Sequence, residues 1–157
     1  MEVSRKFQVP YLGGASKDGE TIYIDMRFPT SYLQRDGKIV HPIPYLVRHE
    51  VYESQLMKQG IEFNTAHRLS AQHEKEQLRH SRIDVKQYYE NIYKWVMDTI
   101  HQIDAKKLPP DLNLQPYIGD GLETVLRQMG LPSEHFKHPH SATPQFLKKE
   151  MLKDIKE

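Results

Sequence analysis

The residues best suited to chemistry lie in one short run, Arg48-His49-Glu50-Val51-Tyr52-Glu53. A histidine and a carboxylate at positions i and i+4 of a helix stand one above the other, with β-carbons about 5–6 Å apart, so both can reach one divalent ion. His49 and Glu53 have this spacing. In the His-Glu-x-x-His arrangement two histidines bind Zn²⁺ and the intervening glutamate is the general base. Here Glu53 replaces the second histidine, while Glu50 keeps the position of the base.

A third ligand has to come from another element, and His67 is the best candidate. It begins a stripe of residues spaced by four, three and four, His67, Ala71, Glu74 and Leu78, which we expect to face inward. Three protein ligands leave one position of tetrahedral zinc open, which is typical of catalytic sites. Glu74 lies roughly 10 Å beyond His67 along the helix axis. We therefore expect Glu74 to orient one of the metal-binding residues without binding the same ion itself.

The chemistry of such a site would be hydrolysis. Zinc lowers the pKa of a water that it binds to about 7. A neighbouring carboxylate can then carry the proton from the nucleophile to the leaving group. This is the role we predict for Glu50.

These polar residues are predicted to occupy buried helical faces. At about 100° per residue, His49 and Glu53 share a sector with Leu46, Leu56 and Met57. The opposite face of the same helix is polar and carries Arg48, Gln55, Lys58 and Gln59, but not His49 or Glu53. On the second helix the outer side is expected to carry Arg68, Lys75 and Arg79. A lone charge on an inner face is expensive, so something must compensate it.

Three helices are expected to position the site. The first should span 44–59 and end at Gly60, which suits a left-handed C-terminal cap. Asn64 is a good N-cap for a second helix that runs to His80. Asp84 should cap a third helix whose apolar stripe extends to Ile103.

The N-terminal third is expected to form strands. Residues 7–11 and 21–26 have strand composition and are separated by a break at Gly13-Gly14. Asp36-Gly37 is typical of a hairpin turn between 31–35 and 38–40. The fold class that follows is α+β, with a small N-terminal antiparallel sheet and hairpins packed on a three-helix core, plus short C-terminal helices.

The domain organisation predicted from this pattern is one α+β domain over 1–130, carrying the metal site, and a polar tail with a terminal helix over 131–157. The tail is a candidate docking segment for a protein partner. It also holds three histidines to which we assign no metal-binding role: His135, His138 and His140.

Composition narrows the class of protein. The chain has 157 residues, 38% of them hydrophobic, which suits one soluble domain. With 22 Lys and Arg against 21 Asp and Glu, neither nucleic acid nor a membrane is predicted as a partner. The absence of cysteine limits metal ligands to His and carboxylates. No secretion signal is seen, so a cytoplasmic or virion-associated location is expected.

The same motifs resemble those of a known group of proteins. A strand with Tyr23-Ile24-Asp25 precedes the run 46–53, and Ala66-His67 and Glu74 follow it. This order, over about residues 10–117, is similar to that of small uncharacterised phage and bacterial proteins described as zincin-like metallopeptidases. The resemblance implies metal ligands at His49, Glu53 and His67, with Glu50 as the base.

Two interpretations of the site remain open. The first is a zinc-dependent hydrolase, resembling metallopeptidases, that acts on a peptide or amide bond of a peptide or protein substrate; iron or manganese is the alternative metal. The second is a non-catalytic structural or interaction protein, for example a virion component. In that protein His49 and Glu53 would pair with each other or with Arg68 as a buried ion pair, and His67 would be an ordinary interior histidine.

Overall fold

The computed structural model describes residues 1–100 and 102–114. The predicted tail 131–157, its three histidines, the short C-terminal helices and the domain boundary at 130 lie outside the described residues. None of the described helices is long and apolar enough to cross a membrane.

In the part of the chain that the structure describes, five short strands form two small sheets. The first sheet holds β1 (Glu2–Ser4), β3 (Thr21–Ile24) and β2 (Gly13–Ala15) in that spatial order. β2 runs antiparallel to β3, and β1 runs parallel to it. The second sheet is a hairpin of β4 (Tyr32–Leu33) and β5 (Ile39–Val40), with Gly37 at φ +93° in its turn.

The α+β class and the hairpin at Asp36-Gly37 are confirmed, but the first sheet is mixed. β1 was not predicted, and it supplies the parallel pair. Residues 7–11 were predicted as strand and form none, because Pro10 has no N–H and Tyr11 turns the chain at φ +54°. The expected break at Gly13-Gly14 is instead part of β2.

Glycine is required in β2 because helix α1 (Ile43–Lys58) approaches it closely. A β-carbon built on Gly13 would lie 2.8 Å from Glu50 Oε1. A glycine inside a strand often marks such a close approach. Gly13, one of the two glycines that suggested a break, therefore leaves room for the Glu50 side chain of the helix that carries the candidate site.

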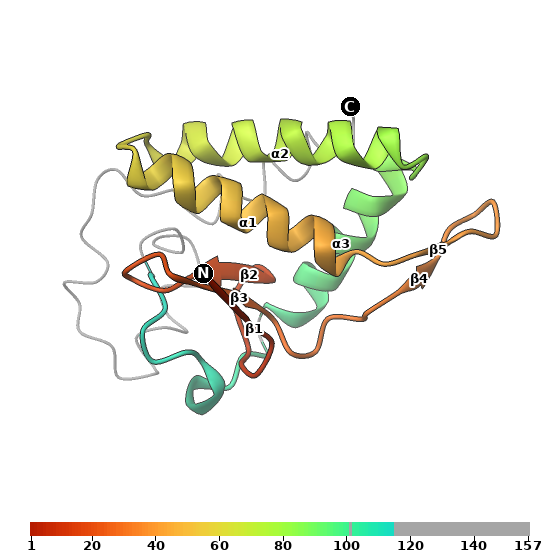
Figure 1. The fold of residues 1–157 in the computed structure, drawn as a ribbon. Helices are drawn as coiled ribbons and strands as arrows, with labels where there is room; N and C mark the ends of the chain where they lie inside the picture. Colours follow the sequence, from red (N-terminus) through yellow and green to blue (C-terminus); the bar gives the residue numbers. More distant parts are fainter. Residues whose placement is uncertain (101, 115–157) are drawn as a thin grey trace.

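The described residues also form three α-helices, which Figure 1 shows in their spatial arrangement. α1 ends as predicted, with Gly60 at φ +89°. α2 (Phe63–His80) begins before Asn64, because Ala66 N donates to Glu62 O and adds an earlier turn. α3 (Val85–Thr99) is capped by Asp84, whose carboxylate accepts from Gln87 N, and it stops short of Ile103. A short 3₁₀ helix, Ala105–Lys107, follows.

α1 lies between α2 and the three-stranded sheet (Figure 1). α1 and α2 pack side by side and run in opposite directions, since only a short turn joins them. The most deeply buried apolar residues include Ile22 and Ile24 of the three-stranded sheet, Leu78 of α2, and Tyr88 and Val96 of α3. The core thus lies where the helices meet the sheet.

The prediction that Lys75 faces outward was wrong. This residue is buried, because α3 covers that side of α2. Its ammonium lies 5.7 Å from the centre of the Tyr89 ring, a cation–π distance.

Asp25 holds the turn that leads into β2. Its carboxylate is fully buried, accepts the N–H groups of Val9 and Arg27 at 2.8 Å each, and receives two further bonds from the Arg27 guanidinium. Its own N–H donates to Leu12 O at 2.7 Å. Tyr11 and Leu12 both have positive φ, a conformation that costs of order 1–3 kcal/mol per residue. Asp25 therefore stabilises a strained turn beside the candidate site.

We predict that Asp25→Asn lowers the free energy of unfolding by about 2–4 kcal/mol, because it removes the charged acceptor of a buried pair. Urea denaturation measures this change. Asp98→Asn, at an exposed position of α3, is the matched control and should change stability by less than about 0.5 kcal/mol. Equal effects of the two substitutions would show that Asp25 has no special structural role.

Candidate metal centre

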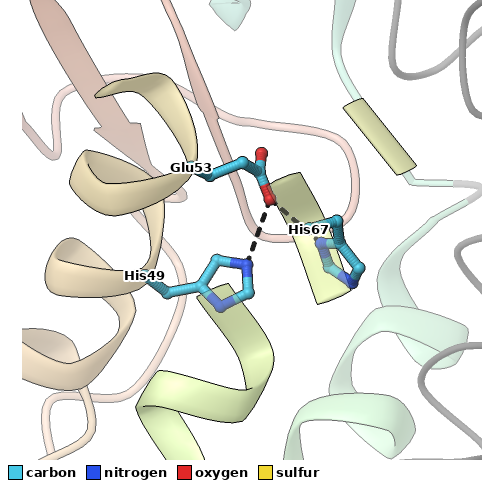
Figure 2. Close-up of side chains that lie close together, drawn as sticks. All are labelled: His49, Glu53 and His67. Atoms are coloured by element: carbon cyan, nitrogen blue, oxygen red, sulfur yellow. Dashed lines mark hydrogen bonds and ion pairs between the residues drawn. The ribbon is translucent and has the colours of Figure 1, made fainter. Parts of the chain in front are cut away.

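His49, Glu53 and His67 meet between α1 and α2. Each offers one ligand atom, and these atoms all lie within 4.8 Å of one another. Glu53 Oε2 lies 3.2 Å from His49 Nε2 and 3.0 Å from His67 Nδ1. Figure 2 shows both histidines beside the Glu53 carboxylate, one from each helix. The group could therefore hold a metal ion.

Local sequence and helix packing each supply part of this geometry. The i, i+4 spacing places His49 and Glu53 on one face of α1. His67 is brought to them by the packing of α2 on α1, and its ring stacks on Phe63 with centroids 5.8 Å apart. The side chains of the three residues are only 10–14% exposed. The prediction that they face inward is confirmed.

Glu74 lies on the other side of the His49 ring. Its Oε1 is 3.4 Å from His49 Nδ1, which is longer than an ordinary hydrogen bond but within ion-pair distance. The hydroxyls of Tyr88 and Tyr89 donate to this carboxylate at 2.9 and 2.6 Å. His49 thus stands between two buried carboxylates. This is the position from which a glutamate can orient a metal-binding histidine.

No role in the site was predicted for Tyr88 or Tyr89. The structure gives their hydroxyls a specific acceptor, Glu74, on the neighbouring helix. A buried tyrosine normally finds a hydrogen-bond partner, so two adjacent tyrosines on an inner face were a signal for a buried acceptor.

Glu50 lies beside the cluster and lines two cavities. The larger, about 270 Å³, also borders Glu53 and His67, and the smaller, about 80 Å³, borders His49 and Glu74. Both cavities are lined by Tyr11, Gly13, Glu50 and His67. The three candidate ligands are therefore in contact with space that a small molecule or chain segment could enter.

Burial and mutual proximity shift the protonation of these groups. Burial by itself would lower the pKa of His49, but Glu74 and Glu53 outweigh it and raise that pKa well above 6.5. Burial would raise the pKa of Glu53, yet the hydrogen bonds from both histidines lower it to about 2. Burial, followed by the charge of Glu53, raises the pKa of Glu50 to about 8. Without metal, the cluster holds a charged histidine between two carboxylates.

The donor set fits a zinc ion. Imidazole nitrogens and carboxylate oxygens bind zinc at about 2.0–2.2 Å, so two ligand atoms of a tetrahedral site lie about 3.3 Å apart. The observed separations of 3.2 and 3.0 Å are close to this value. Iron and manganese bind the same types of ligand, so these three residues do not distinguish them from zinc.

The alternative of a metal-free ion-pair cluster is compatible with the same contacts. His49 and Glu53 do pair with each other. Arg68, which was considered as a further partner, is instead exposed and its guanidinium donates to Thr65 Oγ1 at 3.5 Å. His73 and His80 are exposed, as predicted.

Comparison with known proteins identifies no similar protein. No protein-family model matches the sequence, and no curated protein or solved structure gives a significant match. The resemblance to zincin-like metallopeptidases and the roles of the individual site residues stay predictions, based on the motifs and the geometry.

The raised pKa of Glu50 predicts how Glu50→Gln changes stability. A carboxyl whose pKa is raised by folding contributes stability at low pH that is lost as pH rises from about 4.5 towards 8. The amide has no such loss. In metal-free protein at pH 8, the variant should be more stable than the wild type by on the order of 1–3 kcal/mol, and much less so at pH 4.

Urea denaturation in the presence of a chelator, at both pH values, measures this difference. Glu76→Gln, at an exposed position of α2, is the control and should show no such change with pH. An identical pH dependence of Glu50→Gln and the wild type would contradict the prediction.

The contact with His49 predicts that Glu74→Gln weakens zinc binding by about 10- to 100-fold. The amide keeps an acceptor oxygen for one of the two tyrosines and presents an NH2 group, which can donate to the hydroxyl oxygen, to the other. It loses the charge that lies 3.4 Å from His49 Nδ1. Competition with a chromophoric chelator measures the affinity, and Glu76→Gln again serves as control. Unchanged affinity in Glu74→Gln would exclude the proposed orienting role.

Proposed function

We propose that this protein is a zinc-dependent hydrolase that cleaves a peptide or related amide bond. One observation carries the proposal: two histidines and a glutamate from two helices converge within 4.8 Å, and a further glutamate, Glu50, lines the adjoining cavity. Three nitrogen and oxygen ligands with space beside them are typical of catalytic zinc.

Each residue has a distinct part in this proposal. His49, Glu53 and His67 would hold the ion, which when bound polarises a carbonyl and makes water more acidic. Glu50 would take a proton from water in the cavity and pass it to the leaving amine. Glu74 would accept Nδ1–H of His49, so that Nε2 presents its lone pair on the side of Glu53.

The raised pKa of Glu50 describes the metal-free protein. A bound dication beside a carboxyl favours its charged form. Glu50 would then be able to accept a proton at neutral pH. This step rests on its place next to the cluster, at the wall of the cavity.

We predict one tightly bound zinc per chain in protein purified without an affinity tag, and loss of that metal in His67→Ala. Glu50→Gln should keep the zinc but lower the rate of peptide cleavage by about 10²- to 10⁴-fold, because it removes only the general base. Metal analysis and cleavage of a mixed peptide library give the two measurements. His80→Ala, an exposed histidine on the same helix as His67, is the control for metal content.

The second candidate is a structural or interaction protein without catalysis. It is favoured by one observation: the contacts of His49 with Glu53 and Glu74, and of Glu74 with Tyr88 and Tyr89, join α1, α2 and α3 without any metal. Fully folded protein that binds no metal would exclude the zinc-dependent hydrolase and favour this second candidate. Iron or manganese in place of zinc would keep the site but change its chemistry.

A further inference from the structure

The larger cavity continues from the candidate metal cluster along α1. Five residues of one helix face line it: Glu50, Glu53, Ser54, Met57 and Lys58. Their spacing by three and four residues means that they succeed one another along the helix axis. The opposite wall is the segment 13–19, which includes β2 and the turn that follows it. The cavity therefore has Glu50 and Glu53 at the cluster end, and at the other end two lysines, Lys17 and Lys58, together with Asp18.

Lys58 is held in place by the turn opposite. A β-carbon on Gly19 would lie 2.6 Å from Lys58 Cε, so the lysine stem lies directly against this glycine, which has φ +72°. Beside it, Ser54 Oγ donates to Gly19 O at 3.4 Å. The Lys58 ammonium meets Glu20 Oε1 at 2.6 Å. Lys58, which lines the cavity, thus already pairs with a carboxylate, although Glu20 itself is not among the lining residues.

The partner carboxylate is exchangeable. The side chains of Lys58 and Glu20 are 39% and 60% exposed, and exposed ion pairs contribute only about 0–1 kcal/mol. The other acid at this end, Asp18, is engaged by its own turn, where it accepts from Ser16 Oγ and Glu20 N. Lys17 adds a second exposed cation to the cavity wall.

We propose that Lys58 binds a carboxylate of the substrate, in place of Glu20, while the bond to be cleaved lies at the metal cluster. This inference rests on the proposed hydrolase function and gives its substrate class, an acidic peptide. Lys58 follows Glu53 by five residues, about 7.5 Å along the helix. An extended chain covers about 3.3 Å per residue, so the acidic group lies roughly two to three residues from the cleaved bond.

Two chemically matched probes test the inference without cleavage. Suberic acid monohydroxamate carries a zinc-binding group and a carboxylate at opposite ends of a chain long enough to reach Lys58, and its methyl ester lacks the charge. Zinc-loaded full-length protein should bind the acid about three- to fivefold more tightly than the ester, as for a favourable exposed ion pair. Isothermal titration calorimetry measures both affinities.

Three variants locate the effect. Lys58→Ala should remove the preference for the acid, and Glu20→Gln should increase it, because the competing carboxylate is gone. Lys86→Ala is the matched control, since Lys86 also pairs with an acid, Glu90 at 4.0 Å, but lies on α3 outside the cavity lining. Equal binding of acid and ester by the wild type, or a preference that survives Lys58→Ala, would overturn the inference.

The carboxylate that binds Lys58 could belong to an acidic side chain of the substrate or to its C-terminus, and a peptide library distinguishes these two sources. Enrichment of Asp or Glu at a fixed position, with free and amidated C-termini alike, identifies an acidic side chain. Cleavage at a fixed distance from the C-terminus that is lost on amidation identifies the terminal carboxylate. Cleavage with neither pattern overturns this inference alone. Absence of cleavage with a preserved preference for the acid overturns the hydrolase but leaves Lys58 as a carboxylate-binding residue. Failure of both hydroxamates to bind overturns both proposals.

Discussion

The burial of two carboxylates around one histidine is the constraint on which the rest of this structure depends. Glu53 and Glu74 approach opposite nitrogens of His49, and both are almost inaccessible to solvent. A buried carboxylate costs several kcal/mol unless it is paired and hydrogen-bonded. His67 completes the pairing of Glu53, and the hydroxyls of α3 complete that of Glu74. The three helices therefore have to keep one relative position, or these charges lose their partners.

The sheet contributes to the site through a glycine and a strained turn. Asp25 stabilises the turn at Tyr11 and Leu12 through its hydrogen bonds. This turn leads directly into β2, which packs beside α1. Because Gly13 has no side chain, Glu50 can lie against the strand and still border both cavities. A side chain at this position would collide with the carboxylate to which we assign the role of base.

The same atoms can serve an ion pair or a metal ion. A hydrogen bond between Glu53 and a histidine places the oxygen and the nitrogen about 3 Å apart. Two ligand atoms of one zinc ion lie at a similar distance from each other. Protonated His49 compensates the buried carboxylates when metal is absent, and a dication would take over that role when it is present. Metal binding should thus release protons, and metal content, more than geometry, separates the enzyme from the structural protein.

Periodicity in the sequence was sufficient to predict the three helices, the inward position of His49, Glu53 and His67, and the spacing that brings His49 next to Glu53, because these depend on residues within one or two turns. Gly60 and Asp84 marked helix ends for the same local reason. Only the tertiary structure decided which α1 residue Glu74 contacts. α1 and α2 run in opposite directions, so a residue beyond His67 on α2 lies beside His49, one turn before Glu53 on α1. The burial of Lys75 and the parallel strand β1 likewise depend on elements distant in sequence, whose packing no local pattern records.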